Sequence, residues 1–201
     1  MIGIIDYGMG NLYSVRNALL SLGVKAKIIS QPRQLQKMDA CILPGVGAFG
    51  DAMDILDKSG LAEAIKDYTV KGNRLLGICL GLQLLFERSS ESPGKEGLGL
   101  VRGEVLRFKG RAKIPHIGWN KLSIKKKNPI FARVKDGSFV YFCHSYYVKP
   151  SERGVVIGET DYIKKYASVI AKDNIFGIQF HPEKSQAVGL RILENFAKAK
   201  R

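Results

Sequence analysis

The stretch of sequence that is most informative about the fold reads Arg74-Leu75-Leu76-Gly77-Ile78-Cys79-Leu80-Gly81-Leu82-Gln83. Its apolar start predicts a buried strand over Leu75–Ile78, and a helix is expected from about Leu80 to Arg88. Between them stands Gly-x-Cys-x-Gly, the pattern of a nucleophile elbow with cysteine in place of serine. The two glycines leave room for a tight strand-to-helix turn that lifts the Cys79 side chain above the edge of a sheet. The position of Cys79 at the N-terminus of a helix also favours the thiolate form of its side chain.

The segments before this stretch alternate between apolar strands and amphipathic helices. Strands are expected at Ile2–Ile5, Ala26–Ile29 and Asp39–Leu43. Helical spacing of apolar residues follows at Leu12–Leu22, Ala48–Leu56 and Leu61–Val70. This order, with strands that are apolar throughout, predicts an α/β fold whose mostly parallel central sheet has helices on both faces.

The second half of the chain has a different pattern. Short strand-like segments with turn residues between them are expected at Gly103–Phe108, Asn120–Ile124, Phe139–Phe142, Gly154–Glu159, Ala167–Ala171 and Ile175–Phe180. A last amphipathic helix is predicted from Gln186 to about Ala199. Because no repeat or linker interrupts the sequence, we expect one domain over residues 1–201, with an antiparallel β extension in its second half.

Composition narrows the class of protein further. A chain that is 45% hydrophobic and 25% charged is typical of a globular protein. The longest apolar run, Leu75–Phe86, is too short to span a bilayer, and the N-terminus has no basic segment typical of a signal peptide. Three widely spaced cysteines without a Cys-x-x-Cys pair argue against a disulfide framework or a zinc site. These features predict a cytoplasmic protein without metal or other cofactor.

The net charge is unusual for a chain of this size. There are 32 Lys and Arg against 18 Asp and Glu, which gives a formal charge of +14. The basic residues are spread along the chain, and the longest run is only Lys125-Lys126-Lys127. This distribution favours solvated side chains and an anionic metabolite or protein partner over nucleic acid or membrane binding. A nucleic-acid-binding module stays open as an alternative, which salt-sensitive binding to random duplex would reveal.

A thiolate nucleophile needs a histidine, and the histidine needs an orienting carboxylate. His181-Pro182-Glu183 follows the predicted strand Ile175–Phe180, so His181 is expected at the same sheet edge as Cys79. The proline stiffens the link that can hold Glu183 against the imidazole. The other two histidines, His116 and His144, are interpreted as structural or interface residues.

Acyl transfer by this nucleophile also requires an oxyanion hole. The turn Pro44-Gly45-Val46-Gly47 follows a predicted parallel strand, and its glycines leave backbone N–H groups unshielded. We predict that amides of Val46 and Gly47, with the N–H of Leu80, bind the developing oxyanion.

The Gly77–Gly81 motif together with His181–Glu183 resembles the catalytic triad of the class I (triad) glutamine amidotransferases. Four further motifs are similar to those of the glutaminase subunits in the imidazole glycerol phosphate synthase family. They are Ile5-Asp6-Tyr7-Gly8-Met9-Gly10-Asn11-Leu12, Pro44-Gly45-Val46-Gly47-Ala48-Phe49, Pro115-His116-Ile117-Gly118-Trp119-Asn120 and His144-Ser145-Tyr146. The resemblance extends from Gly3 to the final helix.

This resemblance implies a flavodoxin-like amidotransferase fold and hydrolysis of glutamine through a thioester on Cys79. Ammonia would pass to a separate (β/α)8-barrel synthase subunit in a heterodimer. That subunit would form imidazole glycerol phosphate and aminoimidazole carboxamide ribonucleotide in histidine biosynthesis. The resemblance also implies that glutamine is held by Gly47, Gln83, Ser145 and Tyr146.

By the same resemblance, Asn11, Trp119 and Asn120 would lie at the subunit interface near the ammonia exit. Some of the excess lysines and arginines are expected to ring Asn11 and Trp119 and to meet acidic residues of the barrel.

Two other functions are considered. Another amidotransferase glutaminase, such as that of pyridoxal phosphate synthase, is disfavoured by Gly45-Val46-Gly47 and by Pro115–Asn120. A partner-independent cysteine hydrolase would show amidase activity without any second subunit.

Overall fold

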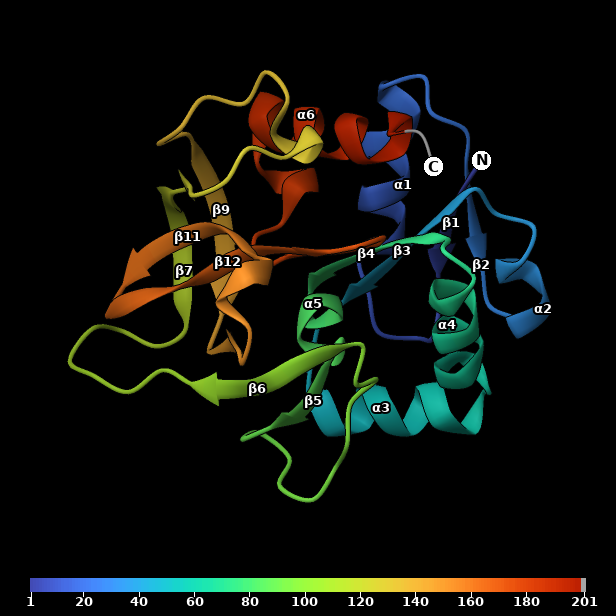
Figure 1. The fold of residues 1–201 in the computed structure, drawn as a ribbon, viewed down its shortest axis with the longest axis horizontal. Coiled ribbons are helices and arrows are strands. Elements are labelled where there is room, and N and C mark those ends of the chain that lie inside the picture. Colours follow the sequence, from blue (N-terminus) through green and yellow to red (C-terminus); the bar gives the residue numbers. More distant parts are fainter. Residues whose placement is uncertain (200–201) are drawn as a thin grey trace.

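A parallel sheet forms the half of the molecule that carries the N-terminus (Figure 1). The structure is a computed structural model and describes residues 1–199. The parallel strands lie side by side in the order β2 (Ala26–Ile29), β1 (Ile2–Ile5), β3 (Ala40–Gly45), β4 (Arg74–Cys79) and β13 (Ile175–Ile178). Every residue of β1, β3 and β4 is buried, and all are apolar except Arg74 at the start of β4. This explains their central position, because both faces of the strands are covered.

An antiparallel region extends this sheet beyond β13. The sheet continues through β12 (Lys164–Lys172), β10 (Tyr146–Pro150), β6 (Val101–Arg107) and β5 (Phe86–Ser89). Pairing is antiparallel up to β6, and β5 joins β6 in parallel. Beside them β11 (Val156–Tyr162) pairs with β12 and with β8 (Ser123–Ile124). A separate two-stranded antiparallel sheet consists of β7 (His116–Lys121) and β9 (Phe139–His144).

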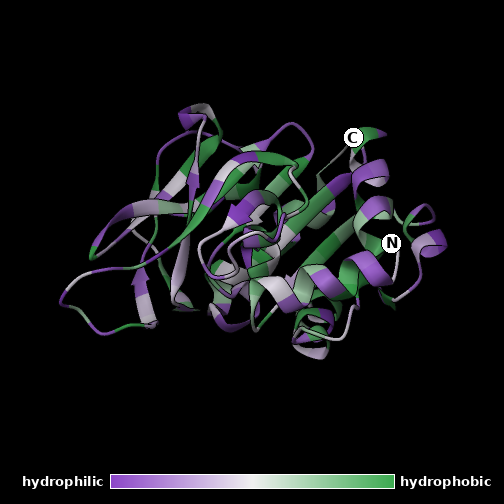
Figure 2. Cartoon of the chain, turned by 90° about the horizontal axis from the view of Figure 1, so that it is seen from below, coloured by the Kyte–Doolittle hydropathy of each residue, from purple (hydrophilic) through white to green (hydrophobic). Residues whose placement is uncertain are grey.

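Helices cover both faces of the parallel strands. On one face lie α1 (Leu12–Ser21) and α6 (Gln186–Lys198); on the other lie α3 (Phe49–Lys58), α4 (Leu61–Val70) and α5 (Leu80–Leu84) (Figure 1). Each face has its own hydrophobic core, and Figure 2 shows hydrophobic strands inside and hydrophilic residues on the outer helices. The short elements are α2 (Pro32–Leu35), η1 (Pro129–Phe131), η2 (Arg153–Val155) and η3 (Pro182–Lys184).

The predicted fold class is confirmed: the sheet is mostly parallel where expected, and its second half is antiparallel. The helix expected from Leu80 to Arg88 is wrong in its second half, because α5 ends at Leu84 and Phe86–Ser89 forms β5. The run Leu82–Phe86 is apolar except for Gln83, and a short, mainly apolar run does not distinguish a buried helix from a strand. Residues 86–89 form a strand because they pair with β6 at the edge of the sheet.

Two further features of the strands differ from expectation. The strand β10 was not predicted, although it lies inside the sheet between β12 and β6. The expected strand Asn120–Ile124 is in fact two strands in different sheets: β7 begins at His116 and ends at Lys121, and β8 follows. Strand propensity is a weak guide here, because cross-strand neighbours determine which residues pair.

The register of β4 and β13 positions the two segments that matter for chemistry. Ile78 pairs with Ile178, so Cys79 and the segment after β13 leave the sheet at the same carboxyl edge. Side chains that follow neighbouring parallel strands gather at this edge, where open α/β sheets bind ligands. No helix within residues 1–199 is both long and apolar enough to cross a membrane.

Helix α6 packs directly on the η3 turn, and we expect this contact to limit the size of residue 189. A Cβ atom on Gly189 would overlap the carbonyl group of Pro182. The substitution Gly189→Ala is therefore expected to lower the free energy of unfolding by about 1–3 kcal/mol, the usual cost of overpacking. Urea denaturation measures this difference. Gly154→Ala is the matched control, because nothing lies within 4 Å of the added methyl; an equal loss in both variants would contradict the prediction.

Candidate active site

The nucleophile elbow is present at the junction of β4 and α5. Cys79 is the last residue of β4 and the N-cap residue of α5, with φ +55° and ψ −109°. A positive φ is uncommon for a residue with a side chain and costs free energy that the surroundings must offset. Cys79 therefore stands at the N-terminus of α5, where the backbone N–H groups of the first turn have no acceptor within the helix.

Two glycines make this turn possible, as the sequence pattern predicted. A Cβ on Gly77 would lie 2.6 Å from the carbonyl oxygen of Gly81, and a Cβ on Gly81 would overlap the carbonyl oxygen of Leu43. The helix therefore approaches β3 and β4 more closely than any larger residue would allow.

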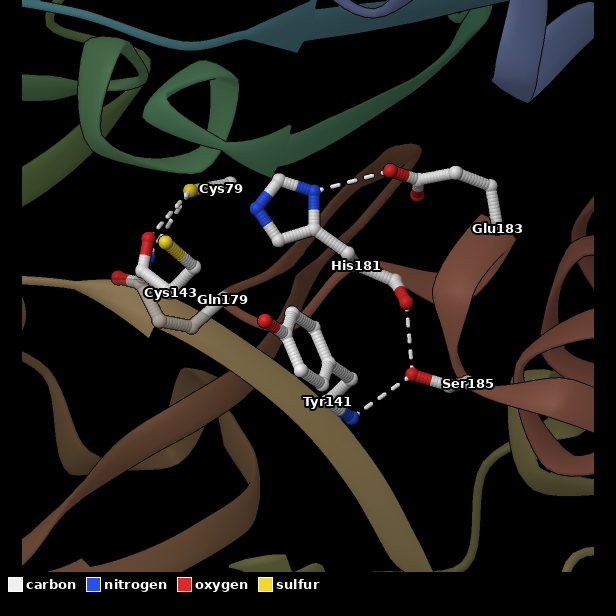
Figure 3. Close-up of polar contacts among 7 residues, drawn as sticks. All are labelled: Cys79, Tyr141, Cys143, Gln179, His181, Glu183 and Ser185. Carbon is white, nitrogen blue, oxygen red and sulfur yellow. Dashed lines mark hydrogen bonds and ion pairs between the residues drawn. The ribbon is translucent and has the colours of Figure 1, made fainter. Parts of the chain in front are cut away.

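His181 and Glu183 reach Cys79 from the segment after β13. The Nδ1 atom of His181 is 3.0 Å from Oε1 of Glu183, and both side chains are buried. Figure 3 shows the imidazole between the sulfur of Cys79 on one side and the carboxylate on the other. The structure thus brings the three predicted triad residues together in the order that a thiol, a base and an orienting carboxylate require.

Hydrogen bonds to β9 hold the histidine in place. The His181 N–H donates to the Tyr141 carbonyl at 2.9 Å, and the Ser185 hydroxyl donates to the His181 carbonyl at 2.6 Å. The same hydroxyl accepts from the Tyr141 N–H at 2.9 Å (Figure 3). Ser185 is completely buried and was not identified from the sequence.

The environment of His181 favours the protonated imidazole. Burial alone would lower its pKa, but the hydrogen bonds and negative charges of Cys79 and Glu183 outweigh burial and raise the pKa to about 10. A protonated His181 beside Cys79 is the arrangement that stabilises a thiolate near neutral pH.

A cavity of about 340 Å³ opens beside the sulfur and brings most of the predicted site residues together. Its walls include Cys79 and His181 and the residues assigned to the oxyanion and to glutamine, which are Val46, Gly47, Leu80, Gln83, Ser145 and Tyr146. No cluster of His, Cys, Asp or Glu suited to a metal ion occurs in residues 1–199.

The backbone amides assigned to the oxyanion differ in their surroundings. Leu80 is the first residue of α5, so the helix supplies no acceptor for its N–H. The Val46 N–H instead donates to the Met9 carbonyl at 3.4 Å. Gly47 has φ +104°, and a Cβ there would lie 2.6 Å from Cε of Met9. In this conformation Leu80 is the clearest donor toward the cavity.

Gln179 is a buried contact of the nucleophile that the sequence analysis missed. Its Nε2 lies 3.7 Å from the Cys79 sulfur, and its Oε1 accepts from Nε2 of Gln83 at 3.3 Å. Gln83 Nε2 also donates to the Tyr146 carbonyl at 3.2 Å. The sequence does hold a signal for Gln179, because it is the one polar residue in the otherwise apolar segment Ile175–Phe180.

The three residues assigned to the interface do not lie together. Asn11 is the N-cap of α1 and lines a very small cavity with His181 and Glu183. Trp119 packs edge-to-face on Tyr141, with ring centroids 6.0 Å apart. The Asn120 side chain lies on the other face of β7, where Nδ2 donates to the Asp161 carbonyl at 2.9 Å.

Trp119 belongs to an exposed apolar face of the small sheet. Ile117, Trp119 and Phe139 are 57%, 45% and 51% exposed on β7 and β9. Two lysines border this face: Lys121 lies over the Phe139 ring at 5.7 Å, and Lys184 lies over the Tyr141 ring at 5.9 Å.

The expectation that basic residues ring Trp119 is only partly met. The groove that Trp119 lines with Ser138, Phe139 and residues 185–188 contains no Lys or Arg. A larger basic group instead lines a separate cavity of about 640 Å³ on β10, β11 and β12; its basic members are Lys125, Lys126, Lys149, Arg153, Lys164 and Lys165.

The triad geometry predicts how Cys79 reacts with an alkylating agent. We expect His181→Ala to slow alkylation of Cys79 by iodoacetamide at pH 7 by about tenfold or more, since the neighbouring imidazolium is lost. Glu183→Gln is expected to slow it less, because the carboxylate acts only through the histidine.

Residue-specific mass spectrometry measures these rates. Exposed Cys143 serves as the internal reference, and Cys41, whose pKa is raised to about 12 by burial, is expected to stay unreactive. An unchanged Cys79 rate in His181→Ala would contradict the assignment of His181.

Comparison with protein families gives one match over nearly the whole chain. The family model described as glutamine amidotransferase class-I matches residues 3–199. Among curated proteins, the imidazole glycerol phosphate synthase subunit HisH of Caldanaerobacter subterraneus subsp. tengcongensis is 52% identical over 198 residues, which covers 98% of each chain. The protein of the same name from Bacillus subtilis is 48% identical over 204 residues, covering 98% of this chain and 96% of its own.

Solved structures share the fold at low sequence identity. A crystal structure described as a glutamine amidotransferase superposes with a TM-score of 0.78 at 19% identity and covers 98% of this chain and 99% of its own. The structure of PurLQS from Thermotoga maritima gives a TM-score of 0.77 at 17% identity. The match covers 97% of this chain and 96% of the PurLQS chain.

Proposed function

This chain belongs to the class I glutamine amidotransferase family, and on that basis we propose that it is the glutaminase subunit of an imidazole glycerol phosphate synthase. It hydrolyses glutamine to glutamate and ammonia. The observation that carries the proposal is the alignment of Cys79, His181 and Glu183, with Cys79 and His181 in the wall of one cavity and Glu183 behind the histidine. The near full-length similarity to two imidazole glycerol phosphate synthase subunits supports the choice of synthase.

The first half of the reaction forms a thioester. The Cys79 thiolate attacks the side-chain carboxamide carbon of glutamine, and the oxygen becomes an oxyanion near the Leu80 N–H. His181, protonated in the resting site, donates its proton to the departing nitrogen, which leaves as ammonia. Glu183 holds the imidazole and stabilises its charged form before that transfer.

The second half releases glutamate. The now neutral His181 takes a proton from water, the hydroxide attacks the thioester carbon, and the bond to the Cys79 sulfur breaks. Glutamate leaves, and the thiolate and imidazolium are restored. One water is consumed for each glutamine, and no cofactor takes part.

The hydrogen bonds of Gln83 determine which of its atoms can face glutamine. Its Nε2 donates both to the Tyr146 carbonyl and to Oε1 of Gln179. With both N–H groups engaged, Oε1 is the atom that remains for the substrate, and an amide oxygen suits the α-ammonium group. Ser145 and Gly47 line the same cavity and complete the proposed binding site.

The proposed partner is a (β/α)8-barrel synthase subunit in a heterodimer, which uses the ammonia to form imidazole glycerol phosphate and aminoimidazole carboxamide ribonucleotide. The exposed apolar residues of β7 and β9, with Trp119 at their centre, are proposed as part of the docking face. We also assign Asn11 and Asn120 to the proposed interface. We further propose that residues 1–201 act as one amidotransferase domain in the cytoplasm.

Removal of the nucleophile tests the two-site reaction. In the complex with the barrel subunit, Cys79→Ala is expected to abolish glutamine-dependent synthesis of imidazole glycerol phosphate, a loss of about a thousandfold or more. Synthesis from added ammonium salt is expected to continue, because the barrel site is intact. Both rates are measured by product formation on the same preparation.

The wild-type complex with glutamine and with ammonium salt is the control. Glutamine-dependent synthesis that survives in Cys79→Ala would contradict the thioester mechanism. Loss of the ammonium-dependent rate in a correctly assembled complex would contradict the two-site arrangement.

A further inference from the structure

Two histidines that the proposed mechanism does not use form a buried pair beneath the cavity. Nδ1 of His116 lies 3.3 Å from Nε2 of His144, and both rings are buried. His144 also lines the catalytic cavity. It is the last residue of β9 and immediately precedes Ser145 and Tyr146, two residues that are proposed to contact glutamine.

The Tyr146 carbonyl determines the tautomer of His144. Nδ1 of His144 lies 2.7 Å from this oxygen, which can only accept a hydrogen bond, so Nδ1 carries the proton. Nε2 of His144 is then an acceptor in a neutral ring. Its single lone pair faces two donors, the Tyr166 hydroxyl at 3.2 Å and Nδ1 of His116 at 3.3 Å. Nδ1 of His116 also lies 3.4 Å from the Tyr166 hydroxyl oxygen, which can accept its proton while the hydroxyl donates to His144.

The tautomer of His116 is determined by Asn120, which contacts its Nε2 atom. Nδ2 of Asn120 lies 3.3 Å from Nε2 of His116, and the same amide group donates to the Asp161 carbonyl at 2.9 Å. The amide nitrogen is therefore a donor toward His116, and Nε2 accepts. The proton of His116 must be on Nδ1, where it faces His144.

The two rings are held neutral by burial. Burial lowers the pKa of His116 to about 4 and that of His144 to about 3. For His144 the nearby His116 and His181 lower the pKa further, against the opposing effect of the Tyr146 carbonyl. Near pH 7 each ring therefore has one donor and one acceptor, as the hydrogen bonds require.

We propose that His144 is a positioning residue for glutamine. His116 and Tyr166 support its tautomer at Nε2, and Asn120 fixes the tautomer of His116. His144 and Gln83 both donate to the Tyr146 carbonyl, at 2.7 and 3.2 Å. The histidine therefore fixes the carbonyl that holds the Gln83 amide with its oxygen toward the substrate. This inference rests on the proposed glutaminase function and adds residues that do not touch the reacting atoms.

The proposal predicts an effect on glutamine binding that is larger than the effect on chemistry. His144→Leu removes the donor to Tyr146, and we expect KM for glutamine to rise about tenfold while kcat changes by about threefold or less. His144→Asn places an amide N–H near the position of Nδ1, and we expect it to restore KM to within about threefold of wild type. Both are measured in the complex with the barrel subunit.

Two controls separate positioning from stability. Tyr68→Phe removes a similar buried hydrogen bond, from a side chain to the Met38 carbonyl at 3.0 Å, far from the cavity. It is expected to lower the melting temperature and leave KM unchanged. The rate of Cys79 alkylation in His144→Leu is expected to match wild type, because the sulfur keeps its neighbours.

The tautomers can be observed directly. The chain has only three histidines, so the ¹⁵N spectrum of the ring nitrogens is simple to assign with the variants above. We expect protonated Nδ1 and unprotonated Nε2 for both His116 and His144. Asn120→Asp replaces the donor by an acceptor, so the proton of His116 is expected to move to Nε2.

Each result bears on one proposal. A proton on Nε2 of His144, or equal KM values for wild type and His144→Leu, would overturn the positioning role. Equal KM increases in His144→Leu and His144→Asn would also overturn it. If the wild-type complex does not hydrolyse glutamine, the proposed function itself fails.

Discussion

The parallel pairing of β4 with β13 is the contact on which the rest of the site depends. These strands are 100 residues apart in the chain, yet Ile78 and Ile178 pair in register. The nucleophile follows one strand and the base follows the other, so a change of register would separate Cys79 from His181. Alternate side chains of both strands pack into the two cores, so a shift of one residue would exchange them between closely packed interiors.

Several contacts around this pairing stabilise both the fold and the catalytic site. The elbow glycines let α5 approach β3 and β4, and the same approach holds Cys79 at a positive φ with the sulfur toward the cavity. Ser185 connects β9 to the triad segment by two hydrogen bonds. The contacts that stabilise the fold thus also hold Cys79 and His181 in place.

Much of this could be predicted from the sequence, because the informative signals are local. The Gly-x-Cys-x-Gly motif, the apolar strand before it and His181–Glu183 each fall within a few residues, and the structure brings them together. The family and the fold class are confirmed, whereas the roles of the individual site residues stay predictions. Gln179, Ser185 and the His116–His144 pair were not assigned a role near the nucleophile. The contacts that bring them to the site, from Gln179 to Cys79, from Ser185 to Tyr141 and between the two histidines, join residues distant in sequence.

The exposed apolar face of β7 and β9 has a consequence for the colloidal behaviour of the isolated chain. Ile117, Trp119 and Phe139 offer a surface on which a second copy could also dock. Both copies carry a formal charge of +14, and the lysines Lys121 and Lys184 border this face. Like charges repel two copies at the moment of encounter, while an acidic surface is attracted. The excess positive charge therefore discourages self-association of a face that has to stay apolar.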